Sequence, residues 1–313
     1  MALVGSTTTR HVNDAVSTSL TRRERNVGGL ILQALLVLAA LVTLLVLFAL
    51  LARIITEAWP VLTNRGSAFL TDKIGSEPGK VGVWSGLYGS FFVGLGVVVL
   101  AIPIGVAAAI HLEEYASTSR LNRLLLVNIR NLAGVPAVIY GVLGLTIFVG
   151  WLRPVTEGKT VIAAALTLAV LVLPLVIITA SEAIRAVPQG LREAGYGVGA
   201  TKWEVTRDHT LPYALPGILT GMMLSISRAL GEAAPLILIG AITGLLPRTS
   251  LTGKFTALPI LIFTWAGRPP KGQTIDWTNV AAAAGLVLLI LVLLFNVAGI
   301  LLRQRFERRR SGT

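Results

Sequence analysis

Two opposite charges lie four residues apart inside a stretch that is otherwise apolar or small. Arg228 and Glu232 are embedded in the segment Ser225-Ile226-Ser227-Arg228-Ala229-Leu230-Gly231-Glu232-Ala233-Ala234-Pro235-Leu236. An arginine at the centre of a membrane helix costs about 2.5–3.5 kcal/mol on insertion scales, so such a residue needs a polar surrounding. An arginine fork can donate two parallel hydrogen bonds to an oxyanion. We therefore predict that Arg228 and Glu232 line a pathway for an anionic substrate.

The role of Glu232 depends on what the arginine binds. Residues four apart share a helix face, so the pair is expected to be in contact. Glu232 would repel a bare dianion, but it can hold Arg228 between substrate passages or accept a hydrogen bond from a protonated oxyanion. The alternative is an ion pair that only fixes helix packing, and the residues alone leave both interpretations open.

A long polar segment between two apolar spans, 181–212, is the second candidate. Pro188 suits the first turn of a helix, and Gly199 suits the left-handed position just past a helix end. Thr201 followed by Glu204 has the spacing of a capping box, so a second helix is expected to start there and to stop at Pro212. The segment is therefore predicted to be two short helices joined at Gly199.

This segment resembles the EAA loop of ABC-type importer permeases, because it keeps the spacing from the Glu-Ala pair through the glycine to Leu-Pro. Two positions depart from the pattern, since Gly195 replaces a second alanine and His209 replaces an aliphatic residue. The resemblance implies that the helix pair inserts into a groove on a cytoplasmic ATPase subunit; the alternative is an ordinary amphipathic linker. The candidate ATPase-coupling residues are Glu193, Ala194, Gly195, Gly199, Thr201, Glu204, Leu211 and Pro212.

The elements around both candidates are those of a membrane protein. Hydrophobic residues make up 54% of the 313 residues and charged residues only 13%, about half the charged fraction of a soluble domain. Six segments are long enough to span about 30 Å of hydrocarbon. They are expected at Val27–Ile55, Trp84–Ile110, Leu124–Trp151, Val161–Ala180, Ala214–Leu246 and Val280–Leu302. The apolar run Phe255–Trp265 is too short to span, and we expect it at the interface or in a re-entrant segment.

The distribution of positive charge predicts the orientation. Of the 27 Lys and Arg residues, 16 fall in the two tails and in the loops after the second and fourth spans, and 9 fall in the other loops. The positive-inside rule then places both termini in the cytoplasm. We predict a disordered basic tail at 1–26, a first transmembrane helix at 27–56, a permease core at 84–302 and a second basic tail at 303–313. The net charge of +12 is explained by anionic lipid, and no nucleic-acid partner is expected.

Several kinds of chemistry are not expected. The chain has no cysteine, and its three histidines are scattered without the spacing of metal ligands, so no metal or cofactor is predicted. Gly158-Lys159-Thr160 imitates the end of a phosphate-binding loop, but Arg153 stands where the leading glycine belongs. The chain is therefore not expected to be an enzyme, and it must obtain its energy from another subunit.

The phrase Ser-Arg-Ala-Leu-Gly-Glu-Ala-Ala-Pro-Leu at 227–236 resembles the fifth helix of phosphate permeases, and its ending is closer to the PstA type than to the PstC type. The likeness covers about 84–302 and implies an all-α membrane protein with the six-helix bundle of a type I ABC importer permease. It also implies that Arg228 and Glu232 serve phosphate passage. The implied partners are a PstC-type permease, two PstB-type ATPase subunits and a PstS-type extracytoplasmic phosphate-binding protein, at a bacterial cytoplasmic (inner) membrane. The rival functions are an ABC permease for sulfate or molybdate, and a non-transporting scaffold or passive channel.

Overall fold

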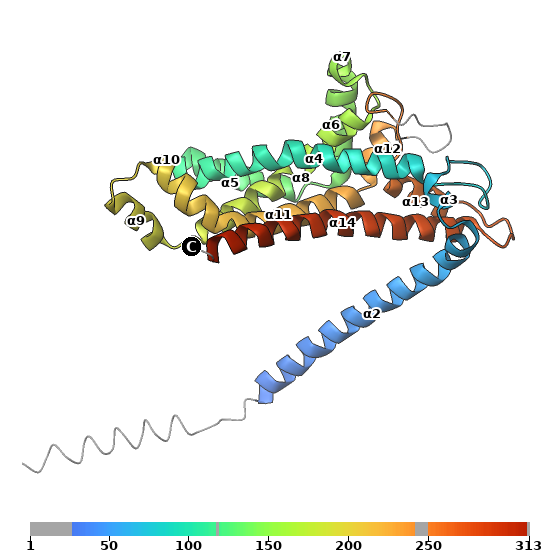
Figure 1. Cartoon of the computed structure of the whole chain (residues 1–313), viewed down its shortest axis with the longest axis horizontal. Coiled ribbons are helices and arrows are strands. Elements are labelled where there is room, and N and C mark those ends of the chain that lie inside the picture. Colours follow the sequence, from blue (N-terminus) through green and yellow to red (C-terminus); the bar gives the residue numbers. More distant parts are fainter. Residues whose placement is uncertain (1–26, 117–118, 242–249, 312–313) are drawn as a thin grey trace, which may run out of the picture. The chain divides into compact units, whose positions relative to one another are not determined.

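The computed structural model describes residues 27–116, 119–241 and 250–311, and these residues form helices and no strands (Figure 1). The chain divides into two units, Met1–Arg53 and Ile54–Thr313. The predicted tail at 1–26 lies outside the described residues. The elements are α2 (Val27–Arg65), α3 (Ala68–Thr71), α4 (Trp84–Ile110), η1 (His111–Tyr115), α5 (Arg120–Ala133), α6 (Ala137–Gly144), η2 (Leu145–Trp151), α7 (Arg153–Thr156), α8 (Val161–Arg185), α9 (Gln189–Gly197), α10 (Lys202–Glu204), η3 (Val205–Thr210), α11 (Leu211–Gly231), α12 (Ala234–Ile239), α13 (Leu258–Ala266) and α14 (Trp277–Ser311), where η denotes a π-helix.

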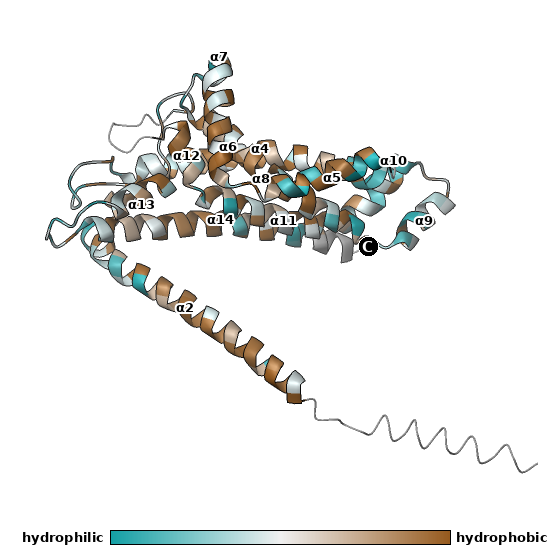
Figure 2. Ribbon diagram, turned by 180° about the vertical axis from the view of Figure 1, so that it is seen from behind, coloured by the Kyte–Doolittle hydropathy of each residue, from teal (hydrophilic) through white to brown (hydrophobic). Residues whose placement is uncertain are grey.

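Five of these helices, counting adjoining α and π stretches as one, are long and apolar enough to cross a membrane, or six if one bent pair counts as a span. The part of α2 within the first unit exposes its leucines on every side, as expected of a helix whose surroundings are hydrocarbon (Figure 2). Both terminal helices are longer than expected. The helix α2 continues to Arg65, and α14 continues to Ser311, so much of the segment predicted as a tail at 303–313 is helical.

The second unit is organised around α8, which packs against α4 on one side and α11 on another. Glycines permit this close approach. A Cβ at Gly105 of α4 would lie 2.6 Å from Val176, and one at Gly217 of α11 would lie 2.8 Å from Ala183. Small residues at such crossings are typical of membrane helices, because van der Waals packing replaces the hydrophobic effect as the driving force.

The short apolar run at 255–265 forms α13, which is too short to span. Its residues Leu258, Leu261 and Trp265 are fully buried and pack with α14 and the end of α2 within the second unit. The side chain of Asn279 donates a hydrogen bond to the carbonyl of Glu57 at 2.8 Å and joins the same elements. This run is therefore a buried part of the helix bundle.

The third predicted span, Leu124–Trp151, is not one continuous helix. Helix α5 ends at Ala133, α6 begins at Ala137, and the two directions differ by 98°. Pro136 supplies the break, because proline lacks the N–H of a helix interior and disfavours the helical conformation in the residue before it. The hydroxyl of Tyr140 donates to the carbonyl of Leu132 at 2.8 Å and ties the two arms together across the bend.

The fifth predicted span, Ala214–Leu246, is also interrupted, and the interruption falls at the candidate site. Helix α11 ends at Gly231, Glu232 is extended with φ −79° and ψ 115°, and α12 starts at Ala234. Pro235 accounts for the break, since in a continuous helix its ring would clash with the carbonyl of Gly231 and its missing N–H would leave that carbonyl unpaired. Helix α12 then ends at Gly240, which has a φ of 91°, and the predicted end at Leu246 lies outside the described residues.

Candidate functional site

The predicted helix–turn–helix at 181–212 is present, and its turn forms as the sequence indicates. Gly199 follows α9 with a φ of 84°, a conformation that L side chains rarely adopt. Thr201 and Glu204 form the capping box, in which the Thr201 N–H donates to Glu204 Oε2 at 2.7 Å and the Glu204 N–H donates to Thr201 Oγ1 at 3.4 Å. Gly199, the N-cap Thr201 and Glu204 therefore determine that the second helix begins at Lys202.

The prediction that Pro212 ends this helix is wrong. The chain continues without a break through α10, η3 and α11, from Lys202 to Gly231, and Pro212 lies in the first turn of α11. The π-helical turn Val205–Thr210 precedes the proline. A π turn carries an extra residue, so it accommodates the missing N–H and the ring of Pro212 without stopping the helix.

The two departures from the EAA pattern lie together in space. Gly195 is buried where α9 packs on η3, and a Cβ there would lie 2.9 Å from Val205 and 3.3 Å from the His209 ring. A second alanine at position 195 would therefore crowd Val205 and His209, and the glycine allows α9 to pack closely on η3.

The candidate coupling residues do not form one surface. Glu193 and Ala194 are exposed, whereas Gly195 is buried and Leu211 is half-buried. Large side chains beside the turn are exposed as well, with Tyr196 at 45%, Val198 at 84% and Trp203 at 55%. The loop therefore has an outer face of aromatic and apolar side chains and an inner face that packs against its own second helix.

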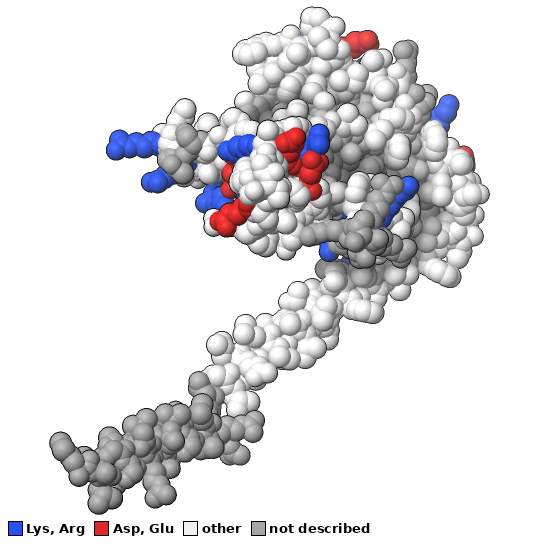
Figure 3. Space-filling view, turned by 60° about the vertical axis from the view of Figure 1, so that its left-hand side comes forward, with Lys and Arg blue, Asp and Glu red and all other residues white. Residues whose placement is uncertain are grey.

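Two ion pairs that the sequence did not predict lie at this end of the bundle, one between α8 and η1 and the other between α9 and η1. Arg185 and Glu113 form a bidentate pair at 2.7 and 3.2 Å, and Arg192 and Glu114 meet at 2.9 and 3.2 Å. The Glu114 side chain is only 5% exposed and that of Arg192 only 19%. Charged side chains crowd this end of the bundle (Figure 3). Glu113 and Glu114 at the end of an apolar span indicated a polar helix end. Their arginine partners are 72 and 78 residues away in the chain and could not be identified from the sequence.

Arg228 and Glu232 are close, but not for the reason that their spacing suggested. Glu232 lies just beyond the end of α11, so the two residues do not share one helix face. The distance from Arg228 Nε to Glu232 Oε1 is 3.6 Å, which is longer than a charge-assisted hydrogen bond. Their side chains are 40% and 25% exposed. Among the described residues no other acidic group pairs with Arg228, so its guanidinium is open to a further anion.

The break that carries Glu232 lies beside the bend of α5 and α6. A Cβ at Gly141 of α6 would lie 2.8 Å from the Pro235 Cα and 2.8 Å from Leu238, so α6 rests directly on α12. One turn before the break, Ser227 donates to Asn296 Oδ1 of α14 at 3.1 Å. Helix α6 thus packs on the segment that carries Pro235, and Ser227, next to Arg228 in the chain, adds a polar contact between α11 and α14.

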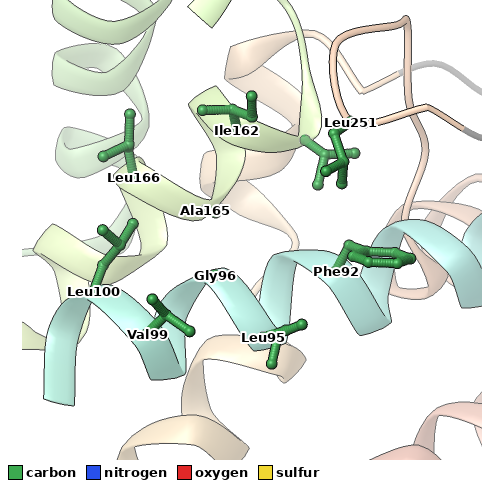
Figure 4. Close-up of a pocket in the computed structure, with 10 residues that line it drawn as sticks. Phe92, Leu95, Gly96, Val99, Leu100, Ile162, Ala165, Leu166 and Leu251 are labelled. Atoms are coloured by element: carbon green, nitrogen blue, oxygen red, sulfur yellow. The ribbon is translucent and has the colours of Figure 1, made fainter.

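A separate apolar cavity of about 410 Å³ lies between α4 and α8, and Figure 4 shows its lining. None of the described residues that line it is charged. Its walls are Phe92, Leu95, Gly96, Val99, Leu100, Val161, Ile162, Ala165, Leu166 and Leu251. It offers an anion no hydrogen-bond donor, so the candidate anion site remains the Arg228 region. The described residues also contain no group of three or more His, Asp or Glu side chains placed to hold a metal.

Comparison with protein families decides what kind of protein has this arrangement. Residues 101–312 match the family described as "Binding-protein-dependent transport system inner membrane component". The chain belongs to this family. The match contains the loop at 181–212, the broken fifth helix and the Arg228 region, so the features described above lie within the family domain. The chain is thus a multi-pass membrane component of a transport system.

Individual relatives show which kinds of permease the chain is similar to. The protein named "Phosphate transport system permease protein PstA 1" of Mycobacterium tuberculosis (strain CDC 1551 / Oshkosh) is 34% identical over 230 residues, 73% of each chain. The PstA protein of Yersinia pestis is 34% identical over 216 residues, 69% of this chain and 70% of that one. The PstC protein of Mesorhizobium japonicum is 27% identical over 294 residues, 87% of this chain and 88% of that one.

Solved structures agree on the fold. A chain of a bacterial ABC transporter involved in the import of the acidic polysaccharide alginate matches with a TM-score of 0.55 at 16% identity, over 88% of this chain and 98% of that chain. A chain of the MetNI methionine ABC transporter in an inward-facing conformation matches with a TM-score of 0.53 at 22% identity, over 72% and 94%. The expected ABC importer permease bundle is therefore confirmed, with its third and fifth spans broken by proline.

The geometry of the turn at Gly199 leads to a prediction about docking. We expect Gly199→Val to reduce co-purification of the ATPase several-fold, because a β-branched residue at positive φ strains the turn that orients α9. Gly197→Val is the matched control, since a Cβ added at either glycine would meet open space but only Gly199 has positive φ. Equal ATPase recovery in the two variants would show that the turn does not orient a docking surface.

Proposed function

We propose that this chain is the PstA-type permease subunit of an ATP-driven importer of inorganic phosphate in a bacterial cytoplasmic membrane. The observation that supports an anionic substrate is Arg228, which lies where a helix of the bundle is interrupted. Within the described part of the chain, Glu232 is the one acidic group that approaches its guanidinium, at 3.6 Å. Relatives named PstA that share about a third of their residues with this chain support phosphate as the anion. The chain itself is a transport component, and ATP hydrolysis belongs to a separate subunit.

The partners follow from the same proposal. A PstC-type permease forms the second half of the pathway, two PstB-type ATPases bind the inner loops, and a PstS-type binding protein delivers phosphate from outside. Both termini and the loop at 181–212 face the cytoplasm, in line with the excess of positive charge on that side. Glu193 and Ala194, together with the exposed side chains Tyr196, Val198 and Trp203, form the outer face of the coupling loop that docks on the ATPase.

In the proposed mechanism, closure of the ATPases on ATP moves α9 and the start of the helix that begins at Lys202. This helix continues to Gly231, so the movement reaches Arg228 through one continuous element. The helix pair tilts the bundle from outward to inward access. Phosphate passes through hydrogen bonds to the Arg228 guanidinium, and no bond of the substrate is formed or broken.

Replacement of the arginine tests the anion site. We expect Arg228→Gln to reduce phosphate uptake about 100-fold, because two charge-assisted hydrogen bonds to the anion together contribute on the order of 3 kcal/mol. The measurement is ATP-dependent uptake of radioactive phosphate by the reconstituted complex, with the amount of assembled complex determined for each variant. Normal uptake by an assembled Arg228→Gln complex would leave the arginine as a packing residue.

Replacement of Glu232 tests how the site discriminates between phosphate and sulfate. At neutral pH phosphate keeps a proton that can donate to Glu232, whereas sulfate has none and is repelled by the carboxylate. We expect Glu232→Gln to lower phosphate uptake less than Arg228→Gln does, and to make unlabelled sulfate about tenfold more effective as a competitor. Sulfate or molybdate that competes well with the wild-type complex would instead favour an ABC permease for one of those anions. A complex that shows no ATP-dependent uptake would favour a scaffold or passive channel.

A further inference from the structure

Arg192 makes more contacts than a neutralising ion pair requires. Its guanidinium donates to Glu114 Oε1 through Nε at 3.2 Å and Nη2 at 2.9 Å. It also donates to the carbonyl of Ile184 through Nη2 at 2.9 Å and to that of Val187 through Nη1 at 2.7 Å. One side chain of α9 therefore contacts both the end of the α4–η1 helix and the end of α8.

Arg192 gives both carbonyls a charged donor, and the Ile184 carbonyl also accepts the Val187 N–H at 3.2 Å. The last carbonyls of an α-helix have no partner within the helix, and a cation at that end interacts favourably with the helix dipole. Ile184 lies in the last turn of α8, and Val187 lies just beyond it. Arg192 thus closes the C-terminal end of α8 with a side chain that comes from the coupling loop.

The burial of these groups makes the contact rigid. Glu114 and Arg192 are 5% and 19% exposed, and beside them lies a buried apolar cluster that joins α4, α8 and α11 through Ala109, Ile184 and Ile218. A buried pair that loses one partner leaves an uncompensated charge, so the arrangement resists separation. The nearby pair of Arg185 and Glu113 is different, because the Arg185 side chain is 55% exposed and both residues lie on the spans rather than on α9.

We propose that Arg192, Glu114 and the carbonyls of Ile184 and Val187 form a clamp that transmits movement of α9 to α4 and α8. Arg192 is a positioning residue, since it acts through the helices and lies in the coupling loop rather than at Arg228. Without the clamp, closure of the ATPase moves α9, but α4 and α8 follow only through the chain connection at residues 186–188 and the packing of α11 on α8. The inference rests on the proposed function, because it requires an ATPase that docks on this loop.

The test uses two matched double variants in the reconstituted four-component complex. Arg192→Met with Glu114→Gln removes the clamp without leaving a buried charge. Arg185→Met with Glu113→Gln removes the neighbouring ion pair in the same way and is the control. The readouts are the ATPase that co-purifies, the rate of ATP hydrolysis, and the phosphate transported per ATP hydrolysed.

The clamp predicts that the Arg192 and Glu114 double variant assembles and hydrolyses ATP but transports about tenfold less phosphate per ATP, a size typical of coupling residues. The control pair is expected to keep the wild-type ratio. Equal ratios in the two double variants, or loss of the ATPase from the Arg192 and Glu114 variant alone, would overturn the proposal.

A single substitution separates a clamp from simple charge neutralisation. Arg192→Lys keeps the positive charge beside Glu114, but one ammonium cannot reproduce the fork that reaches Glu114 and both carbonyls at once. We expect normal assembly and a reduced transport ratio, and a wild-type ratio would contradict the clamp. A wild-type complex that hydrolyses ATP without moving phosphate would contradict the proposed function instead, before any variant is compared.

Discussion

The constraint on which the rest of this structure depends is a positive charge and an interrupted backbone at the same place in an apolar helix bundle. Arg228 lies in the last turn of α11, and Glu232 and Ala233 separate that helix from α12. Neither an arginine nor an open helix end is stable against hydrocarbon, so both must be enclosed by protein or water. Helix α6 bends by 98° from α5 and rests on α12, and Ser227 pairs with Asn296 of α14. These contacts partly cover the break, and the anion site proposed at Arg228 would use the polar surroundings that the break requires.

The same helix that ends at this break begins in the coupling loop. Lys202–Gly231 spans 30 residues, or about 45 Å at 1.5 Å per residue, and the π turn at Val205–Thr210 allows it to pass Pro212 unbroken. A rigid element therefore connects the capping box at Thr201 with the Arg228 guanidinium. The loop holds a second connection in Arg192, which contacts the ends of α4 and α8. An input at one end of the bundle can thus act on several helices together.

Local chemistry was predictable from the sequence where one short segment decides the conformation. Gly199 and the Thr201 and Glu204 capping box were predicted from spacing alone, because each is satisfied within five residues. Most spans were predicted for a similar reason, since lipid requires about 20 consecutive apolar residues whatever the neighbours are. The pairing of Glu114 with Arg192 was not predictable, because it depends on how α4 and α8 pack. The close approach of Gly195 to Val205 and His209 was missed as well, because it depends on the packing of α9 on η3.

The prolines show most clearly which features could not be predicted from the sequence. Pro212 lies in a continuous helix, whereas Pro235 marks a break. The difference is the π turn before Pro212, and hydropathy carries no information about it. The contact between Arg228 and Glu232 was expected for four-residue spacing on one helix, whereas it forms across the end of that helix. The proximity of the two side chains was therefore predicted, but the geometry that produces it was not.

Labelling at Ala233 tests the central claim most directly, which is that an aqueous anion pathway passes the break in the fifth helix. The chain contains no cysteine, so Ala233→Cys, in a complex whose other subunits also lack cysteine, provides one reactive thiol. The measurement is the rate at which a charged, water-soluble thiol reagent labels this position with and without phosphate. The account predicts labelling that phosphate slows and that sulfate does not. A thiol that the reagent does not reach in any nucleotide state, or labelling that phosphate leaves unchanged, would contradict it.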